Sequence, residues 1–538
     1  MADVHQSIEN NFDAVIVGAG FAGMYMLYRL RNLGFSVQVY ERGDGVGGTW
    51  YWNRYPGARC DVESMEYSYQ FSEELQQEWE WTERYAAQPE ILKYANHVAD
   101  RFDLRRGIQF NTSVESAVFD EEQGLWVITT DDKKAVSAQF CIMATGCLSS
   151  TNTPDFKGIE SFQGDTYHTG KWPHEPVDFT GQRIGIIGTG SSAIQSIPII
   201  AKQAKELFVF QRTANYSVPA QNGSIDPEYQ REIKANYTDF RARNNLMPAG
   251  FGANNPSRGD TSVLTAPPEE QAEKLQFRWD RGGLGLLGAF NDFMLTHEAN
   301  EIAAEFVHDK IRSIVKDPDV AKLLCPDQVI GCKRLCVDTD YYETYNQSHV
   351  HLIDIKNAPV ETITPNGLRT GGQEYEFDSL IFATGFDAMT GTLLRIDIRG
   401  RDNKTLNEKW AEGPKTYLGL GIVGFPNLFT ISGPGSPSVL TNMIVSIEQH
   451  VNWIADCIDY MRESKQQCIE ATSPAEEAWV SRVNTLASFT LYPSCNSWYL
   501  GANIPGKPRV FMPHLGFPDY ATKCAEVASN NYEGFVLS

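Results

Sequence analysis

The sequence predicts an α/β fold in which two Rossmann-like domains each bind a dinucleotide and a helical insertion interrupts the second domain. Three observations predict it. Two glycine-rich turns each join an apolar strand pattern to a helical stretch, two strand patterns end in Ala-Thr-Gly, and residues 213–326 lack the alternation of strands and helices. With 538 residues the chain is too long for one hydrophobic core, so several packed units are expected.

A first glycine-rich turn lies near the N-terminus. Strand, turn, helix, strand and acid follow in order at residues 14–17, 18–23, 24–33, 36–40 and Glu41. Gly18 permits a tight turn, Gly20 lets the backbone approach a pyrophosphate, and Gly23 lets helix and strand pack closely. Glu41 is placed to accept hydrogen bonds from ribose hydroxyls, which predicts an FAD site. The alternative is a glycine-rich turn without a ligand.

A second copy of this pattern follows. Its strand, turn, helix and second strand are expected at residues 183–187, 188–193, up to about 200, and 207–210. Gly188 and Gly190 repeat the first turn, with alanine in the third place. No acid follows the second strand, where Arg212 and Thr213 stand instead. Because an arginine suits a 2′-phosphate, this site is predicted to prefer NADPH to NADH. The alternative is that Arg212 is a solvated surface cation.

Two strand patterns that end in Ala-Thr-Gly, at 140–146 and 380–386, are near-copies of each other. Their small residues would let the chain cross between two nucleotide domains; two ordinary strand ends are the alternative. An FAD site and an NADPH site in one chain predict hydride transfer from nicotinamide to flavin. A thiol–disulfide reductase has the same domains but needs a cysteine pair beside the flavin, and Cys60 has no close partner in sequence.

Composition excludes several kinds of partner. With 46 basic and 68 acidic residues, the net charge of −22 argues against nucleic acid and anionic membranes. No apolar run reaches membrane-spanning length, and residues 1–12 are polar, so no membrane span or signal peptide is expected. The ten cysteines lack metal-ligand spacing, and Cys332 and Cys336 have no second pair nearby. They indicate reduced thiols in a cytoplasmic protein without a metal site.

Two long motifs resemble those of a known family. Residues 162–173, FQGDTYHTGKWP, fit neither helical nor strand spacing and are expected to form an irregular loop. The fixed positions are Phe162, Gly164, His168, Trp172 and Pro173. This pattern, and GGTWYWNRYPGARCD at 47–61, resemble motifs of type I Baeyer–Villiger monooxygenases. The resemblance covers nearly the whole chain and is strongest to the branch containing phenylacetone monooxygenase. It implies a hinge at the fingerprint, with His168 structural rather than a general base.

The resemblance implies an NADPH- and oxygen-dependent flavoprotein oxidoreductase. In that family a flavin peroxide attacks a ketone, and the resulting tetrahedral oxyanion rearranges to an ester or lactone. Arg334 matches the catalytic arginine, which stabilises this negative charge, and Asp61 matches its carboxylate partner. Lys333 is expected on the 2′-phosphate and Trp498 over the nicotinamide. Without the resemblance, the preferred interpretation of these residues would be a surface Lys-Arg pair and a structural ion pair.

An N- or S-oxygenating flavin monooxygenase is the alternative function; its fingerprint lacks the Trp-Pro ending.

The site residues expected from the motifs and the resemblance fall into two overlapping sets. The cofactor-binding set is Gly18, Gly20, Ala22, Gly23, Glu41, Gly48, Thr49, Trp50, Trp52, Asp61, Val62, Tyr67, Val114, Met443, Gly188, Thr189, Gly190, Ser191, Ser192, Gln195, Arg212, Thr213, Lys333, Arg334 and Trp498. The substrate-pocket set is Cys147, Leu148, Val439, Leu440 and Met443. The second set is largely apolar, which predicts hydrophobic ketones as substrates.

The order of the motifs predicts the domain organisation. The FAD domain is expected at 1–147 and 386–538, and the NADP domain at 148–212 and 327–385. Between them, 213–326 is expected to be a helical subdomain folded over the NADP domain, with helix starts at Asp226-Pro227 and Pro267-Pro268 and a long helical stretch from Asn291 to Val315. The expected partners are a small ketone and dioxygen, and the protein is expected to be a monomer or weak homodimer.

Overall fold

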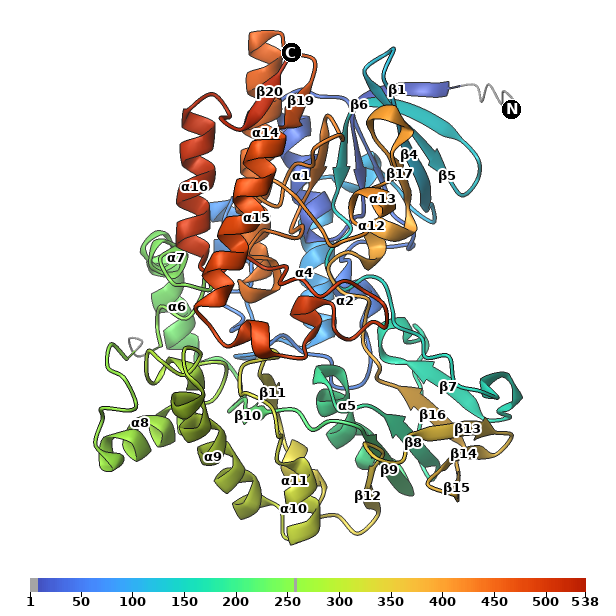
Figure 1. Cartoon of the computed structure of the whole chain (residues 1–538), viewed down its shortest axis with the longest axis vertical. Helices are drawn as coiled ribbons and strands as arrows, with labels where there is room; N and C mark the ends of the chain where they lie inside the picture. The colour runs from blue at the N-terminus through green and yellow to red at the C-terminus, as the bar shows by residue number, and fades with distance from the viewer. Residues whose placement is uncertain (1–7, 256–258) are drawn as a thin grey trace.

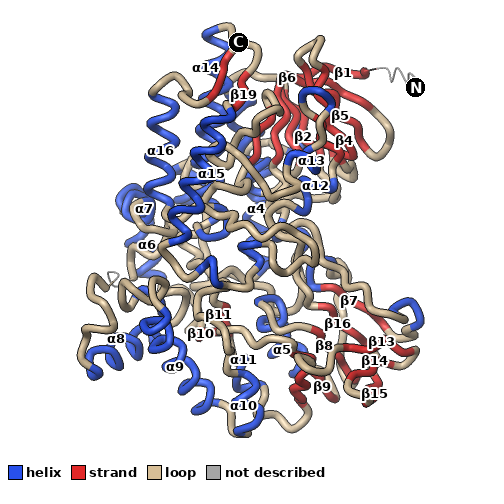
Figure 2. Tube along the Cα trace, viewed as in Figure 1, coloured by secondary structure: helices blue, strands red, loops and turns tan. Residues whose placement is uncertain are grey.

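The computed structural model describes residues 8–255 and 259–538, so residues 1–7 of the polar N-terminal stretch lie outside it. Two sheet-containing halves lie one above the other, and a mostly helical region lies beside the lower half (Figures 1 and 2). Within the described residues, no helix is both long and apolar enough to cross a membrane.

The upper sheet carries the first glycine-rich turn. It consists of β1 (Ile8–Val17), β2 (Val37–Tyr40), β3 (Ile108–Gln109), β4 (Val114–Asp120), β5 (Leu125–Thr130), β6 (Ala135–Met143), β17 (Asp397–Arg399) and β18 (Leu428–Thr430). The strand order is β17-β4-β5-β6-β1-β2-β3, and β18 pairs with β6. The predicted strand at 14–17 is the end of the longer β1. Helix α1 (Phe21–Asn32) begins three residues earlier than predicted, directly after Gly20.

C-terminal helices cover this upper sheet (Figure 1). Helix α14 (Met443–Ser464) packs against α1, where the Tyr25 hydroxyl donates a hydrogen bond to Asn452 Oδ1 at 2.8 Å. Sequence positions more than 400 residues apart therefore share one core. The remaining elements of this half are α2 (Thr49–Trp52), α3 (Glu73–Glu78), α4 (Gln88–Arg101), α12 (Gly391–Arg395), α13 (Leu406–Lys409), α15 (Ser473–Ser488), α16 (Phe517–Ser529), β19 (Ile469–Ala471) and β20 (Phe535–Leu537).

The lower sheet carries the second turn. It consists of β7 (Asp165–His168), β8 (Arg183–Ile187), β9 (Glu206–Gln211), β12 (Val350–Asp354) and β16 (Ser379–Phe382), in the order β12-β9-β8-β16-β7. All four pairings are parallel, and α5 (Ser191–Ala201) follows the turn. A small antiparallel sheet lies beside it: β13 (Val360–Thr364), β14 (Gly367–Thr370) and β15 (Gln373–Glu376).

The fingerprint segment is more regular than predicted. Residues 165–168 form the edge strand β7, with Asp165 opposite Ser379 and His168 opposite Phe382, and a 3-10 turn, Thr169–Lys171, follows. The expectation of an irregular loop was wrong for these four residues, because pairing with β16 supplies backbone hydrogen bonds that side-chain periodicity does not reveal. Trp172 is buried and stacks on Tyr167 at 5.2 Å between ring centroids.

The insertion divides between the two halves. It contains β10 (Ser217–Pro219), α6 (Pro227–Ala235), α7 (Tyr237–Asn245), α8 (Pro268–Arg281), α9 (His297–Ile314) and α10 (Pro318–Leu324). After it follow β11 (Cys336–Asp338), which pairs with β10, and α11 (Tyr341–Thr344). Residues of α8, α9 and α10 join the hydrophobic core of the lower half, whereas Ile233, Tyr237 and Phe240 join that of the upper half.

The prediction that the insertion folds over the NADP domain was therefore wrong for α6 and α7. Arg241 of α7 donates to the Glu66 carbonyl oxygen at 3.0 Å and to Ser68 Oγ at 2.7 Å, both in the upper half. An apolar helix face shows that a helix is buried but does not identify the surface that buries it. The expected helix starts at Asp226-Pro227 and Pro268 were correct, whereas the long helix begins at His297 rather than Asn291.

The cysteines are not all reduced, which corrects the sequence-based prediction. Cys332 and Cys495 form a disulfide, and the other eight cysteines are free. The two partners are 163 residues apart, so spacing rules for neighbouring cysteines could not find the pair.

Candidate active site

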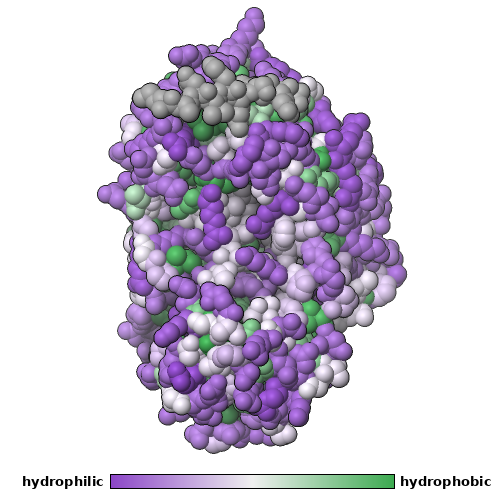
Figure 3. All heavy atoms as spheres, turned by 90° about the vertical axis from the view of Figure 1, so that its right-hand side faces the viewer, coloured by the Kyte–Doolittle hydropathy of each residue, from purple (hydrophilic) through white to green (hydrophobic). Residues whose placement is uncertain are grey.

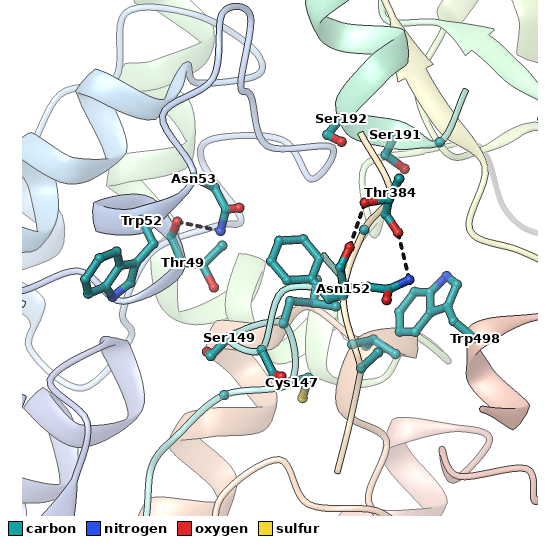
Figure 4. A pocket seen from close by; sticks show the side chains of 18 of the residues that line it. Thr49, Trp52, Asn53, Cys147, Ser149, Asn152, Ser191, Ser192, Thr384 and Trp498 are labelled. Atoms are coloured by element: carbon teal, nitrogen blue, oxygen red, sulfur yellow. Dashed lines mark hydrogen bonds between the residues drawn. The ribbon is translucent and has the colours of Figure 1, made fainter. Parts of the chain in front are cut away.

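A cavity of ≈ 1360 Å³ lies between the two halves and is lined by both glycine-rich turns. Figure 3 shows the face that it opens toward, which is mostly hydrophilic and hollowed at mid-height. In the close view, Thr49, Trp52 and Asn53 lie on one side, Ser191, Ser192 and Thr384 on another, and Trp498 enters from the C-terminal loop (Figure 4). One cavity therefore joins both predicted nucleotide sites.

The first turn has the close backbone approaches that a dinucleotide site needs. Gly18 has φ of +104°, and a Cβ there would lie 2.7 Å from the Ala144 carbonyl oxygen. A Cβ at Gly20 would lie 3.3 Å from Gly48 Cα, so the two backbones approach closely and a side chain at Gly20 would require Gly48 to shift. The Glu41 carboxylate accepts the Ala19 and Gly43 amides at 2.8 and 2.9 Å and lines the cavity. These features fit an FAD pyrophosphate at the α1 N-terminus with its ribose at Glu41.

The second turn repeats this backbone arrangement and adds positive charge. Gly188 has φ of +115°, and its Cβ would lie 2.5 Å from the Ala383 carbonyl oxygen. Arg212 and Lys333 line the cavity nearby, and within the described residues neither has a hydrogen bond or ion pair. Burial first, and then the Arg212 charge, lower the pKa of Lys333. Two neighbouring cations that repel each other fit a phosphate group bound between them.

Arg334 lies at the junction of three segments. Its Nη2 donates to Asp61 Oδ1 at 2.9 Å and its Nη1 to the Val439 carbonyl oxygen at 2.7 Å, while Nε donates to the second oxygen of Asp61. Burial lowers its pKa, but Asp61 more than offsets this, so the pKa of Arg334 is raised overall and the charge is permanent. The side chain remains 23% exposed, toward the cavity, which makes this cation accessible to a ligand.

Helix α5 of the lower half also holds the segment that carries Asp61. Gln195 accepts a hydrogen bond from the Tyr55 hydroxyl at 2.9 Å and donates to the Arg59 carbonyl oxygen at 3.0 Å. A Cβ at Gly57 would collide with the Gln195 carbonyl oxygen. The 53–61 segment therefore contacts both halves. Its contact with Gln195 at Arg59 lies two residues before Asp61.

His168 connects the fingerprint to the crossing strands. It accepts the Gly170 amide at Nδ1, and its Nε2 lies 3.2 Å from the Asn152 carbonyl oxygen and from Thr384 Oγ1. Burial lowers the pKa of His168, which favours the neutral ring. His168 does not line the cavity. This is the arrangement of a structural histidine between the domains and not of a general base.

Most of the predicted site residues line the cavity, with two exceptions. Gly23 lies behind the first turn, where a Cβ would lie 1.8 Å from the Gly18 carbonyl oxygen, so it serves packing and not ligand contact. Leu440 also does not line it, because the 3-10 turn Ser438–Leu440 directs only Val439 into the wall. The close packing expected of Gly23 is confirmed, although Gly23 does not touch the cavity, whereas the expected place of Leu440 in the pocket wall was wrong.

Asparagines in the cavity wall were missed by the sequence-based prediction, and Asn53 and Asn152 are two of them. Asn53 is buried, donates to the Thr49 carbonyl oxygen at 3.0 Å, and leaves its Oδ1 without a partner inside the cavity wall. Asn152 exchanges hydrogen bonds with Thr384 across the crossing point (Figure 4). Asn53 lies within the conspicuous 47–61 motif, which was a usable signal, whereas nothing in the sequence around Asn152 distinguishes it.

Comparisons with known proteins agree with this geometry. A family model described as "Pyridine nucleotide-disulphide oxidoreductase" matches residues 15–246. The chain is 44% identical to a Baeyer-Villiger monooxygenase of Pseudooceanicola batsensis, over 99% of this chain and 97% of the relative. It is 40% identical to a phenazine N-monooxygenase of Lysobacter antibioticus, over 98% and 97%. A solved structure of an oxidized steroid monooxygenase bound to NADP matches with TM-score 0.93 and 51% identity, over 98% of this chain and 99% of that one.

Proposed function

The chain belongs to the type I Baeyer–Villiger monooxygenases, and we propose that Arg334 stabilises the negative charge that develops while it inserts oxygen. The family uses FAD and NADPH to convert ketones to esters or lactones. When bound, FAD accepts hydride from NADPH and supplies the activated oxygen. The chain's own residues must hold the two nucleotides, exclude water and stabilise charge.

The observation that carries the proposal is the environment of Arg334. Asp61 binds its guanidinium through two oxygens and the Val439 carbonyl binds a third N–H, so three contacts fix a permanent cation at the cavity wall. A planar guanidinium held in this way cannot rotate away as charge develops, which is the preorganisation that lowers an electrostatic barrier. Asp61 acts through Arg334, because it orients the guanidinium and partly neutralises it.

We assign the remaining cofactor contacts by their position. The first turn and Glu41 would hold FAD, and the second turn with Arg212 and Lys333 would hold the 2′-phosphate of NADPH. Trp498, whose indole nitrogen has no hydrogen bond within the described residues, would cover the nicotinamide and exclude water. The domain boundaries that we propose for this assignment are 1–147 and 386–538 for the FAD domain and 148–212 and 327–385 for the NADP domain, with 213–326 as the helical subdomain.

The substrate pocket favours hydrophobic ketones. Its wall includes Cys147, Leu148, Val439 and Met443, which leave few groups for a polar substrate to bind. Cys147 Sγ lies 2.9 Å from Ser438 Oγ, which ties the pocket to the loop that contains Val439. Ser438 has a positive φ of +44°, so this loop bulges. We propose a bulky or aryl ketone and kinship with the phenylacetone monooxygenase branch; the 51% identity to a steroid monooxygenase supports a bulky substrate.

Oxygenation of an aromatic nitrogen is the second candidate. A relative of almost the same length with 40% identity is a phenazine N-monooxygenase, so the fold tolerates that activity. The two reactions demand different things of the site, because a ketone adduct is an oxyanion that needs a cation, whereas attack by a nitrogen lone pair creates no such anion. The fixed Arg334 favours the ketone reaction.

A substrate panel tests the proposal. FAD-loaded enzyme is given NADPH and oxygen with an aryl ketone, a bulky cyclic ketone, a small polar ketone and a phenazine. We expect esters or lactones from the first two, with one NADPH consumed for each. N-oxide as the only product would replace the proposed function by its alternative, and turnover of the small polar ketone alone would contradict the assigned pocket. We also propose a cytoplasmic protein that is a monomer or weak dimer; light scattering of the purified protein tests the oligomeric state.

A further inference from the structure

A disulfide joins the two segments that form one wall of the active-site cavity. Cys332 directly precedes Lys333 and Arg334, and Cys495 lies three residues before Trp498. Their Cα atoms are 5.5 Å apart, although 163 residues separate them in sequence. The bond therefore connects the proposed catalytic arginine to the proposed nicotinamide cover.

We propose that Cys332 and Cys495 are positioning residues, whose bond holds the loop carrying Trp498 over the nucleotide while Arg334 stays in place. The proposal rests on the roles assigned above to Arg334 and Trp498. It predicts that the enzyme with both cysteines reduced still binds FAD but holds NADP⁺ less tightly and loses more activated oxygen as hydrogen peroxide.

The two ends of the bond are not equally well anchored. On the Cys332 side, Asn300 of α9 exchanges two hydrogen bonds with Ile330, at 2.9 and 3.0 Å, and Arg334 has its three contacts. The Cys495 side has only the short 3-10 turns Tyr492–Ser494 and Trp498–Leu500 between α15 and α16. The disulfide thus fixes a segment with little regular structure to one that is firmly held.

The C-terminal loop is also attached at other points, and next to Trp498 the buried Tyr499 accepts the Met512 amide at its carbonyl oxygen, at 3.0 Å. The Leu491 amide donates to the Met294 carbonyl oxygen at 2.9 Å, and Asn503 Nδ2 donates to the Phe386 carbonyl oxygen at 2.7 Å. Between them Trp498 contacts the ring of Tyr499 at 4.4 Å, and its indole nitrogen has no hydrogen bond among the described residues. Loss of the bond would remove the covalent hold on the N-terminal side of Trp498, so ordering this side of the loop around NADP⁺ would cost binding energy.

The position of the bond argues against a direct redox reaction with flavin. Lys333, Arg334 and Trp498 line the cavity, but neither cysteine does, and both are buried. The family model that matches residues 15–246 excludes both positions, and the three cysteines in that range are free. The disulfide therefore supports the cavity wall from behind and does not resemble the redox pair of a disulfide reductase.

The experiment compares the two redox states of the purified FAD-loaded enzyme. Dithiothreitol reduces the bond by exchange: two electrons and two protons pass to the cysteines, giving two thiols and one oxidised cyclic reagent. Thiols are counted after denaturation, and eight should titrate before reduction and ten after it. The Kd for NADP⁺, read from the flavin absorbance, should rise about threefold to tenfold on reduction. The yield of ester per NADPH should fall, with hydrogen peroxide making up the difference.

Variants separate positioning from stability. The double variant Cys332→Ser/Cys495→Ser should behave like the reduced wild type and should not respond to dithiothreitol. Cys325→Ser removes a free, partly exposed cysteine near the same region and should retain the full response. The rate of flavin reduction at saturating NADPH should stay within about twofold in all forms, since the bond acts on nucleotide retention and not on hydride transfer. A general loss of folding would lower this rate and the FAD content together.

Ten thiols in wild type purified without reductant would overturn the proposal, as would an unchanged Kd and product yield once the bond is reduced. A dithiothreitol response that persists in the double variant would also overturn it. If no ketone yields an ester, the proposed function fails, yet the thiol count and the Kd for NADP⁺ still decide the role of the disulfide.

Discussion

The two dinucleotide sites have the same backbone arrangement and opposite side-chain charge. In each, the first glycine of the turn has a positive φ and meets the carbonyl oxygen of an Ala-Thr-Gly segment, Ala144 for Gly18 and Ala383 for Gly188. The second strand is followed directly by Glu41 at one site and by Arg212 at the other. In the proposed assignment, the shared backbone geometry holds the pyrophosphate and the single charge after the second strand selects the nucleotide.

Alanine at each first glycine should separate the two sites with the largest effect. Gly18→Ala forces a left-handed conformation on alanine and places its Cβ 2.7 Å from a carbonyl oxygen, so FAD affinity should fall by about a hundredfold. Gly188→Ala should keep FAD but slow flavin reduction by NADPH at low nucleotide concentration by a similar factor. FAD content and stopped-flow reduction measure the two effects. Loss of FAD from the Gly188 variant would mean that the sites are not separable.

Removal of the arginine should change nucleotide preference without changing the fold. Arg212→Ala should raise the KM for NADPH by about one to two decades, because a charge-assisted contact to the 2′-phosphate is lost, and should leave the KM for NADH unchanged. Arg369→Ala, which removes an exposed arginine paired with Glu361 in the same half, is the matched control. Equal losses with both nucleotides would show that Arg212 only supports the structure.

The corresponding change at the first site should affect FAD alone. Glu41→Gln keeps the size and one acceptor but removes the charge that strengthens hydrogen bonds from ribose hydroxyls and from the Ala19 and Gly43 amides. FAD affinity should fall about tenfold, with the KM for NADPH unchanged. Ultrafiltration followed by measurement of free FAD tests this. If the variant retains FAD as well as the wild type does, the Glu41 carboxylate only holds the loop through the Ala19 and Gly43 amides and does not bind FAD.

The smallest expected effect is on the pH dependence of NADPH binding. Burial and Arg212 lower the pKa of Lys333, so its ammonium loses its proton at lower pH than an ordinary lysine does. Because only the charged form binds the 2′-phosphate, NADPH affinity should be complete below this pKa and fall as pH rises through it. In Arg212→Ala the fall should move to higher pH, since one lowering influence is gone. Titrations of the Kd for NADPH against pH test this. The same midpoint for the wild type and for Arg212→Ala would contradict the proposal that Arg212 and Lys333 bind the 2′-phosphate together.

Local sequence predicted both strand–turn–helix units well because each unit is built from neighbouring residues. The strand at 183–187, both glycine-rich turns and the arginine at 212 all lie within about 30 residues of their partners. The same reasoning failed wherever the partner was distant. It missed β7, which forms only through pairing with β16, the packing of α6 and α7 on the upper half, and the disulfide between Cys332 and Cys495. Such contacts depend on how the chain returns on itself, which periodicity does not reveal.

The Arg334–Asp61 pair was expected only from the resemblance to a family. Nothing in the sequence joins positions 273 residues apart, and a Lys-Arg dipeptide alone would suggest a solvated surface. The structure brings the two side chains together because the segment after the insertion returns to the cavity between the halves. Fold topology, rather than local pattern, brings together the pair to which we assign the catalytic role.

One measurement tests the central claim most directly: stopped-flow flavin reduction together with ester yield in Arg334→Ala. Flavin reduction requires only that the two nucleotides meet in the right geometry, whereas oxygen insertion requires the fixed cation. The variant should keep FAD and be reduced by NADPH within about tenfold of the wild-type rate. Its rate of ester formation should fall by roughly two to three decades, and the consumed NADPH should appear as hydrogen peroxide. An Arg334→Ala enzyme that still forms ester near the wild-type rate would contradict the assignment.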